Sequence, residues 1–440
     1  MIKAAKRYLL SIDENLREVI RGSSVAFVLR VIGAGFSFAV NIIVARYLGA
    51  EGAGVYFLAL TVTGIASVVG RFGLDKTLMR YVASFRSKGD WKGINVIHRK
   101  GLLLMTGASV AVALAVYVGA EALAIFVFQD PTLTVPLQYM ACAIPLLNAI
   151  VIYTHLLKGL KKIPYAMLLQ GFGVPLLSIP LFIALAEPYG VSGVAAAYVA
   201  AAFVTAAFGY FLWWCSVPRS SSKRERVITT RGILKSSMPL LWVASMHLVM
   251  KWTDTVMLGI WETSSVVGVY EVAYKTAILT TFVLIAVNSI AAPKFSELYS
   301  QGQMQELEKT ARGATVLLII ASLPIVIPLI VVPSRILAIF GGEFTGGSVF
   351  LVILAVGQFV NVATGSVGYL LMMTGRETIL RNVVTVAGIA NITLNLILIP
   401  YYGGVGAAIA TASSIVIQNV LAAVFVYREL SISLIPAVKA

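Results

Sequence analysis

Residues 41–60 have the sequence NIIVARYLGAEGAGVYFLAL. An apolar run ends at Tyr47-Leu48-Gly49, and after a few small and polar residues a second run restarts at Gly54-Val55-Tyr56. Because so short a polar turn cannot lie within one membrane span, the stretch predicts two transmembrane helices that form a tight hairpin at one side of a bilayer. Residues 254–276 repeat the arrangement, with Leu-Gly followed by Gly-Val-Tyr. This repeat, about half a chain away, indicates an internal duplication.

The composition is that of a membrane protein. Of the 440 residues, 59% are apolar and only 12% are charged, whereas soluble proteins carry roughly 25% charged residues. The apolar residues come in blocks long enough to cross about 30 Å of hydrocarbon. We therefore expect an all-α polytopic membrane protein and exclude a soluble enzyme. Nothing in the sequence resembles a nucleotide-binding loop, a zinc site or a nucleophilic triad, so we expect no enzymatic activity, no metal and no cofactor.

Hydropathy predicts twelve spans in two halves of six. The chain should begin with a cytoplasmic amphipathic segment (1–22), and a basic cytoplasmic linker (217–231) should join the six-helix bundles 23–216 and 232–427 before a cytoplasmic tail (428–440). The predicted spans are 23–47, 53–78, 102–128, 135–157, 165–185, 191–215, 237–260, 266–290, 315–332, 349–372, 383–399 and 405–427.

The basic residues determine the predicted orientation. A net charge of +15 would suit a nucleic-acid partner, but the basic residues lie in short loops between apolar blocks, as the positive-inside rule describes. Alternate loops carry almost none of them, only Arg46 and Arg335. We therefore expect no nucleic-acid partner, a multi-pass protein of the cytoplasmic (inner) membrane, and both termini in the cytoplasm. Two six-span halves of equal orientation are related by an axis along the membrane normal, and together they would form a V-shaped transporter with a central cavity.

The opening of the chain resembles the polysaccharide transporters, the O-antigen-type flippases of the multidrug/oligosaccharidyl-lipid/polysaccharide exporter superfamily. The likeness extends over the length, the twelve spans and the duplication. The motifs that carry it are Arg21-Gly22-Ser23, Ala45-Arg46-Tyr47-Leu48-Gly49, Glu51-Gly52-Ala53-Gly54-Val55-Tyr56, Gly73-Leu74-Asp75-Lys76 and Met79-Arg80-Tyr81-Val82-Ala83. The resemblance implies two six-helix bundles that move a polyprenyl-linked oligosaccharide across the membrane.

Ionisable residues at membrane depth are the candidates for function, because each costs at least about 2.5–3.5 kcal/mol there and usually faces a partner or a wet cavity. Arg30 and Asn41 fall on one helical face of the first predicted span, and His247, Lys251 and Asp254 share a face of the seventh. Aligning the two Leu-Gly pairs superimposes Lys251 on Asn41. We expect these faces to meet between the two bundles.

Two further spans each add opposite charges four residues apart, Arg71 with Asp75 and Glu271 with Lys275. These are either structural ion pairs within one helix or parts of a cationic path for cargo. Our expected substrate-binding residues in the central cavity are Arg30, Asn41, Arg71, Lys251, Lys275, Asn391 and Asn395. Our expected ion-coupling residues are Asp254, His247 and Glu271.

The leading hypothesis is a flippase that moves an anionic polyprenyl-(di)phosphate-linked oligosaccharide by alternating access, for the biosynthesis of a surface polysaccharide such as O-antigen, capsule or exopolysaccharide. Guanidinium and ammonium groups in the cavity suit such a cargo. Membrane lipids and a glycan polymerase or glycosyltransferase are the expected partners. Three alternatives stay open: a multidrug or organic-cation antiporter of the same superfamily, a flippase for the lipid-linked peptidoglycan precursor, and a non-transporting scaffold of a glycan-assembly complex. Coupling to protons or sodium through Asp254 or His247 stays open as well.

Overall fold

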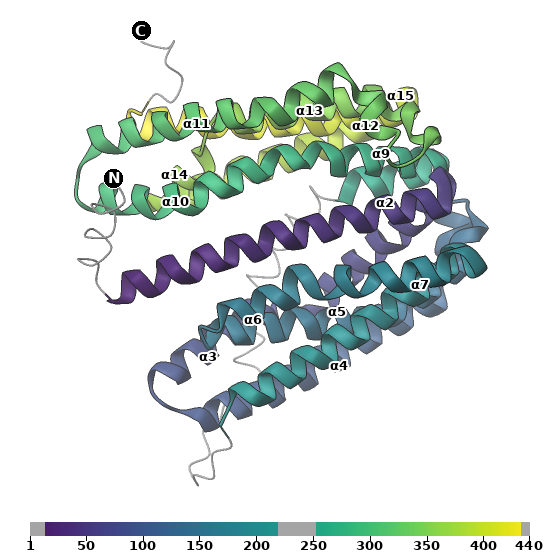
Figure 1. Ribbon diagram of the computed structural model, residues 1–440, viewed down its shortest axis with the longest axis horizontal. Coiled ribbons are helices and arrows are strands. Elements are labelled where there is room, and N and C mark those ends of the chain that lie inside the picture. Colours follow the sequence, from purple (N-terminus) through teal and green to yellow (C-terminus); the bar gives the residue numbers. More distant parts are fainter. Residues whose placement is uncertain (1–13, 219–251, 433–440) are drawn as a thin grey trace.

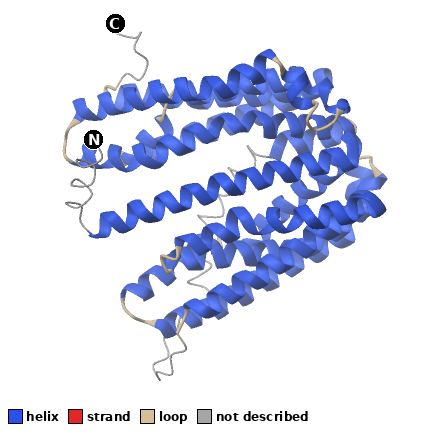
Figure 2. Cartoon of the chain, in the orientation of Figure 1, coloured by secondary structure: helices blue, strands red, loops and turns tan. Residues whose placement is uncertain are grey.

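The computed structural model describes residues 14–218 and 252–432, with side chains from Val31 onward. The described chain is helical throughout, and its loops are short (Figure 2). The N-terminal half contains α2 (Glu14–Arg71), α3 (Leu74–Ser87), α4 (Trp91–Ala122), α5 (Thr134–Gly159), α6 (Ile163–Met167) and α7 (Val174–Ser216). The C-terminal half contains the helical residues 252–261, α9 (Ser264–Ala277), α10 (Thr281–Ser300), α11 (Met304–Val331), α12 (Pro333–Leu337), α13 (Ser348–Ala363), α14 (Val367–Met373) and α15 (Glu377–Leu430). Short π-helical and 3₁₀ turns join some of them: η1 (Leu123–Val127), η2 (Pro131–Leu133), η3 (Leu168–Gly173), η4 (Ile278–Thr280) and η5 (Gly342–Gly347).

Three long helices reverse direction at a single glycine. In α2 the break is at Gly49, whose φ of 67° and ψ of −173° are not helical. Gly190 in α7 (φ 54°, ψ −137°) and Gly403 in α15 (φ 53°, ψ −133°) have nearly the same backbone conformation as each other. A positive φ is readily adopted only by glycine. The hairpin predicted from residues 41–60 is therefore present, and its turn is made by one residue.

Eight helical stretches of the described chain are long and apolar enough to cross a membrane. Three of these stretches contain the glycine breaks at Gly49, Gly190 and Gly403. The count of twelve spans stays a prediction, because most of the seventh predicted span (237–260) and the linker (217–231) lie outside the described residues. Residues 14–22, expected in an amphipathic segment, lie in the first part of α2, and their cytoplasmic location stays a prediction.

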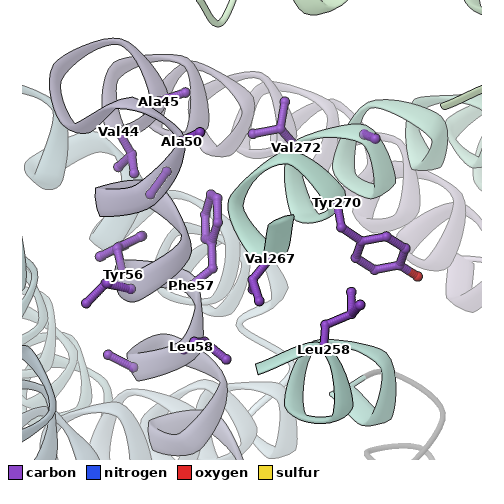
Figure 3. Packing of buried hydrophobic residues seen from close by; sticks show 14 of the residues in the cluster. Val44, Ala45, Ala50, Tyr56, Phe57, Leu58, Leu258, Val267, Tyr270 and Val272 are labelled. Atoms are coloured by element: carbon purple, nitrogen blue, oxygen red, sulfur yellow. The ribbon is translucent and has the colours of Figure 1, made fainter. Parts of the chain in front are cut away.

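The two halves form two lobes (Figure 1). A buried apolar cluster shared by both lobes lies around the first hairpin, where Phe57 of α2 lies beside α9 near Val267 (Figure 3). Two other clusters belong to one lobe each: one around Leu78 and Leu156, the other around Phe295 and Leu370. The lobes thus share a common core at the hairpin end, and each of the other two clusters lies within one lobe, which is the arrangement expected of a V-shaped transporter.

The second predicted span (53–78) is not one helix. The backbone turns at Phe72 (φ 49°) and Gly73 (φ 67°), so α2 ends at Arg71 and α3 begins at Leu74. The amphipathic α3 buries Leu74, Leu78, Val82 and Phe85 on one face, while two of its three basic residues, Lys76 and Arg80, are exposed. α3 continues to Ser87, past residue 78, where the second predicted span was expected to end.

Candidate functional site

A cavity of about 550 Å³ lies mainly within the N-terminal lobe and is closed on one side by the C-terminal lobe. The first hairpin, α5 and the start of α7 supply most of its wall, and the C-terminal lobe contributes Trp252 and Lys275. Its polar lining residues are Ser37, Asn41, Tyr56, Ser67, Arg71, Thr154, His155, Gln170, Ser178, Tyr198 and Lys275. None of the described residues that line this cavity is acidic. The cavity is therefore a cationic, hydroxyl-rich space whose other lining residues are mostly apolar.

Three predicted site residues meet in this cavity: Asn41, Arg71 and Lys275. Asn41 lies on the first helix of α2 and donates its amide to the Ser37 carbonyl oxygen at 2.8 Å, one turn earlier. Arg71 is the last residue of α2, so its guanidinium is placed where the helix ends. Lys275 reaches the cavity from α9 in the other lobe. The wall of this cavity therefore contains cationic side chains from both halves of the chain.

Lys275 makes two contacts besides lining the cavity. Its Nζ lies 2.9 Å from the Glu271 carboxylate, one turn earlier on α9, and 3.4 Å from the centroid of the Phe57 ring on α2. Glu271 also accepts a hydrogen bond from the Thr255 hydroxyl. Glu271 and Lys275 therefore form an ion pair within one helix. This is the first of the two interpretations that the sequence left open. The Phe57 ring adds a cation–π contact across the lobe boundary.

Arg71 and Asp75 are arranged differently from the prediction. The turn at Phe72 and Gly73 separates them onto α2 and α3, so they are not one turn apart on a single helix. Asp75 instead lies 3.8 Å from Nε2 of His155 on α5. The left-handed backbone of Gly73 causes this difference. Residues four apart in sequence share a helical face only where the helix between them is continuous.

His155 and Gln170 are cavity residues that the sequence analysis missed. The Nδ1 atom of His155 lies 2.8 Å from the Val151 carbonyl oxygen, which fixes the ring, while Nε2 faces Asp75. Gln170 accepts a hydrogen bond from Lys158 at 2.7 Å. The signal was present in the sequence, since His155 near the end of the fourth predicted span and Lys158 just after it are one turn apart.

A second polar cluster surrounds Asp254, buried inside the C-terminal lobe with 3% exposure. Its Oδ1 accepts hydrogen bonds from the amides of Asn395 at 2.6 Å and Asn391 at 3.3 Å. Its Oδ2 accepts from the Tyr270 hydroxyl at 2.9 Å and from the Thr411 hydroxyl. Four donors from α9 and α15 therefore satisfy one carboxylate, which is the condition for burying it as an anion.

Asn391 and Asn395 were expected to line the central cavity with the cations. They are instead 1% and 0% exposed and act as donors to Asp254, and they are not among the cavity residues. Their Oδ1 atoms are buried without a hydrogen-bond partner in the described part of the chain. Of the remaining predicted residues, Lys251 and His247 lie outside the described residues, and only the backbone of Arg30, within α2, is described.

Residues 19–299 match the family described as polysaccharide biosynthesis protein. The chain belongs to this family. The resemblance expected from the opening motifs is confirmed. Over 424 residues the chain is 25% identical to the probable low-salt glycan biosynthesis flippase Agl15 of Haloferax volcanii, with 94% of this chain and 85% of the relative covered.

The fold of this polysaccharide biosynthesis family member is similar to that of solved transporters. The lipid II flippase MurJ, in an inward closed conformation, superimposes with a TM-score of 0.74 at 15% identity, covering 92% of this chain and 87% of MurJ. An inward-facing multidrug resistance MATE family transporter of the MOP superfamily gives 0.70 at 15% identity, covering 93% of this chain and 98% of the transporter. At such identities the likeness concerns the fold alone, and it agrees with the predicted MATE-like architecture.

Proposed function

We propose that this protein is a flippase that moves an anionic, polyprenyl-(di)phosphate-linked oligosaccharide across the cytoplasmic membrane by alternating access. The observation that carries the proposal is the cavity with Arg71, Lys275 and Asn41 in its wall and no acidic residue among its described lining. Guanidinium groups bind phosphate bidentately and ammonium groups supply point charge, while the hydroxyl and amide groups suit sugars. Membership of the family and the likeness to a relative named as a glycan biosynthesis flippase support the same function.

The acid-free lining separates this function from that of an organic-cation antiporter. A carboxylate within contact distance stabilises an organic cation in a membrane cavity, because an unpaired charge is costly there. The two buried carboxylates of the described C-terminal lobe are already engaged, Glu271 by Lys275 and Thr255, and Asp254 by four donors. An anionic cargo therefore fits the charges of this cavity and a cationic one does not.

Ion coupling through Asp254 is the second part of the proposal. A carboxylate with four donors is satisfied as an anion, and taking up a proton requires a neighbour that becomes an acceptor. The rotatable hydroxyls of Tyr270 and Thr411 and the unpartnered Oδ1 atoms of Asn391 and Asn395 provide such acceptors. The same oxygens suit a sodium ion, which prefers hard oxygen ligands. Proton or sodium exchange at this cluster would couple the C-terminal lobe to an ion gradient.

The proposal is tested with purified full-length protein in proteoliposomes. One preparation carries a fluorescent polyprenyl-diphosphate-linked oligosaccharide, and a matched one carries a lipophilic fluorescent cation. We expect flipping of the diphosphate lipid above the rate of protein-free vesicles and no protein-dependent movement of the cation. Movement of the cation alone would overturn the proposal in favour of an antiporter, and movement of neither would favour a non-transporting scaffold.

A further inference from the structure

The two lobes touch at the hairpin end through contacts that come in equivalent pairs. Gly54 and Gly268 occupy the same place in the repeated Gly-Val-Tyr motif, and the residues four positions earlier are Ala50 and Ser264. A Cβ built on Gly54 would lie 1.6 Å from the Ser264 carbonyl oxygen, and one built on Gly268 would lie 2.1 Å from the Ala50 carbonyl oxygen. Each motif glycine thus lies against the backbone of the other lobe, and only glycine permits this approach.

Two helix N-termini meet at this contact. The second helix of α2 starts at Ala50, directly after the break at Gly49, and α9 starts at Ser264. Both ends carry backbone amides that have no acceptor within their own helix, together with the positive end of a helix dipole. Placing two such ends side by side is unfavourable unless negative charge is supplied to each.

Each end receives one carboxylate, and in each case it comes from the opposite lobe. Glu343, in η5 of the C-terminal lobe, accepts a hydrogen bond from the Ala50 backbone amide at 2.8 Å. Asp130, in the turn before η2 of the N-terminal lobe, accepts a hydrogen bond from the Ser264 hydroxyl. The contacts connect residues 293 and 134 positions apart in the chain.

The two carboxylates also have equivalent origins in the sequence. The tetrapeptide Leu-Ala-Ile-Phe occurs at residues 123–126 and again at residues 337–340. Asp130 follows the first copy by four residues and Glu343 follows the second by three. Arg46 adds a further contact between the lobes near Glu343, because its Nε donates a hydrogen bond to the Ile339 carbonyl oxygen at 2.8 Å. The duplication has therefore placed one acidic residue in each lobe at the start of the other lobe's hairpin helix.

We propose that Glu343–Ala50 and Asp130–Ser264 form a paired latch, the hairpin latch, that holds the hairpin side of the transporter closed and must release for that side to open. Glu343 binds a backbone amide at one helix end directly, and Asp130 places its negative charge beside the other helix end through the Ser264 hydroxyl. Both contacts are lost once the lobes part. Losing one carboxylate leaves two positive helix ends facing each other with one charge between them, which favours separation. This proposal concerns the contact between the lobes and not the identity of the cargo. It rests on the proposed function only in assuming alternating access.

The test measures the distance between the lobes without cargo. Spin labels are attached to Tyr189→Cys and Tyr402→Cys, which lie at equivalent glycine turns of the two lobes and are 67% and 62% exposed. The background carries Cys142→Ala and Cys215→Ala, since both native cysteines are free and exposed. The measured quantity is the ratio of long-distance to short-distance molecules in lipid nanodiscs.

Glu343→Gln and Asp130→Asn should each raise this ratio about five-fold, which corresponds to a charge–dipole contact of ordinary strength. The double variant should raise it about 25-fold if the two contacts act independently. The matched control Glu121→Gln removes an exposed carboxylate from the end of α4 and should leave the ratio within about two-fold. Should Asp130→Asn fail to yield monodisperse protein, Ser264→Ala removes the same contact from the other lobe.

A double variant whose distance ratio matches that of Glu121→Gln would overturn the hairpin latch. Because no cargo is present, an error in the proposed cargo would leave this result unchanged. Conversely, a protein that flips no glycan lipid but opens on removal of the two carboxylates would support the latch and count against the proposed function.

Discussion

Lys275 of the C-terminal lobe lies with its Nζ 3.4 Å from the centroid of the Phe57 ring in the N-terminal lobe. The same ammonium is paired with Glu271 at 2.9 Å, and the Glu271 side chain is only 9% exposed. The cation therefore balances a buried carboxylate and caps a cavity at the same time. In this way a residue of the cavity wall also contacts, through the Phe57 ring, the opposite lobe.

The first prediction concerns this ion pair. Lys275→Met leaves Glu271 buried without its cation and should destabilise the protein by about 3 kcal/mol. The double variant Lys275→Met with Glu271→Gln removes both charges and should recover most of that loss. Thermal unfolding in detergent, followed by tryptophan fluorescence, measures the effect. Equal losses for the single and double variants would show that the loss does not arise from an unpaired Glu271 carboxylate.

Arg71 gives a prediction about cargo. Arg71→Gln should lower the flipping rate of a diphosphate-linked oligosaccharide by about 10- to 100-fold, since a hydrogen bond to a charged group contributes about 1.5–3 kcal/mol. Arg71→Lys should restore part of the rate, because it keeps the charge and loses the bidentate geometry. Lys76→Gln is the matched control, an exposed cation on α3 that is not in the cavity wall. If Arg71→Gln flips at the wild-type rate, this residue does not contact the cargo phosphate.

The elements that follow from local patterns were predictable from the sequence. Alternation of apolar blocks with basic loops identified the membrane helices, and Leu-Gly followed by Gly-Val-Tyr identified the hairpin with its turn at Gly49. Spacing also identified the pair Glu271–Lys275, because α9 is continuous between these residues. Each of these features depends on a single helix or turn, so the residues that determine it are close together in the sequence.

Contacts that depend on the meeting of distant segments were not predictable in the same way. The spacing of Arg71 and Asp75 suggested one helical face, but Gly73 has a left-handed backbone and places Asp75 beside His155 instead. Asn395 was assigned to the cargo, whereas it donates to Asp254 across 141 residues of chain. A single sequence shows that a buried amide needs a partner but does not identify that partner.

Orientation can be tested with single cysteines in the Cys142→Ala, Cys215→Ala background. Thr263 is exposed in the turn between residues 252–261 and α9, and Ser87 is exposed at the end of α3. If the basic loops are cytoplasmic, Thr263→Cys should react with an impermeant thiol reagent in intact cells, and Ser87→Cys should react only with a permeant one. The reversed pattern would invert the topology, and the hairpin latch would then close the cytoplasmic side.

The contact between the lobes predicts the effect of adding one methyl group. In Gly54→Ala the new Cβ would meet the Ser264 carbonyl oxygen at 1.6 Å, and backbone cannot move aside as a flexible side chain can. We expect a loss of several kcal/mol of stability, or separated lobes in the spin-label measurement. Gly119→Ala is the matched control in α4, since no atom lies within 4 Å of its Cβ. It should be neutral or more stable by about 1 kcal/mol. A Gly54→Ala protein as stable and as closed as Gly119→Ala would contradict the close approach.

The last prediction concerns Asp254 and coupling. Asp254→Asn replaces an acceptor of four hydrogen bonds by an amide whose NH₂ must face two donors, so it should cost about 1–3 kcal/mol of stability. If Asp254 exchanges a proton or a sodium ion, an imposed gradient of that ion should accelerate wild-type flipping and leave Asp254→Asn unaffected. Ser414→Ala is the matched control, because it removes a partner of Asn391 at 3.3 Å without touching the carboxylate, and it should keep the response to the gradient. The measurement is reconstituted flipping with and without each gradient in the three proteins. A gradient response that survives in Asp254→Asn would place coupling elsewhere, and a wild type indifferent to both gradients would mean that the buried carboxylate serves only to hold α15 against α9.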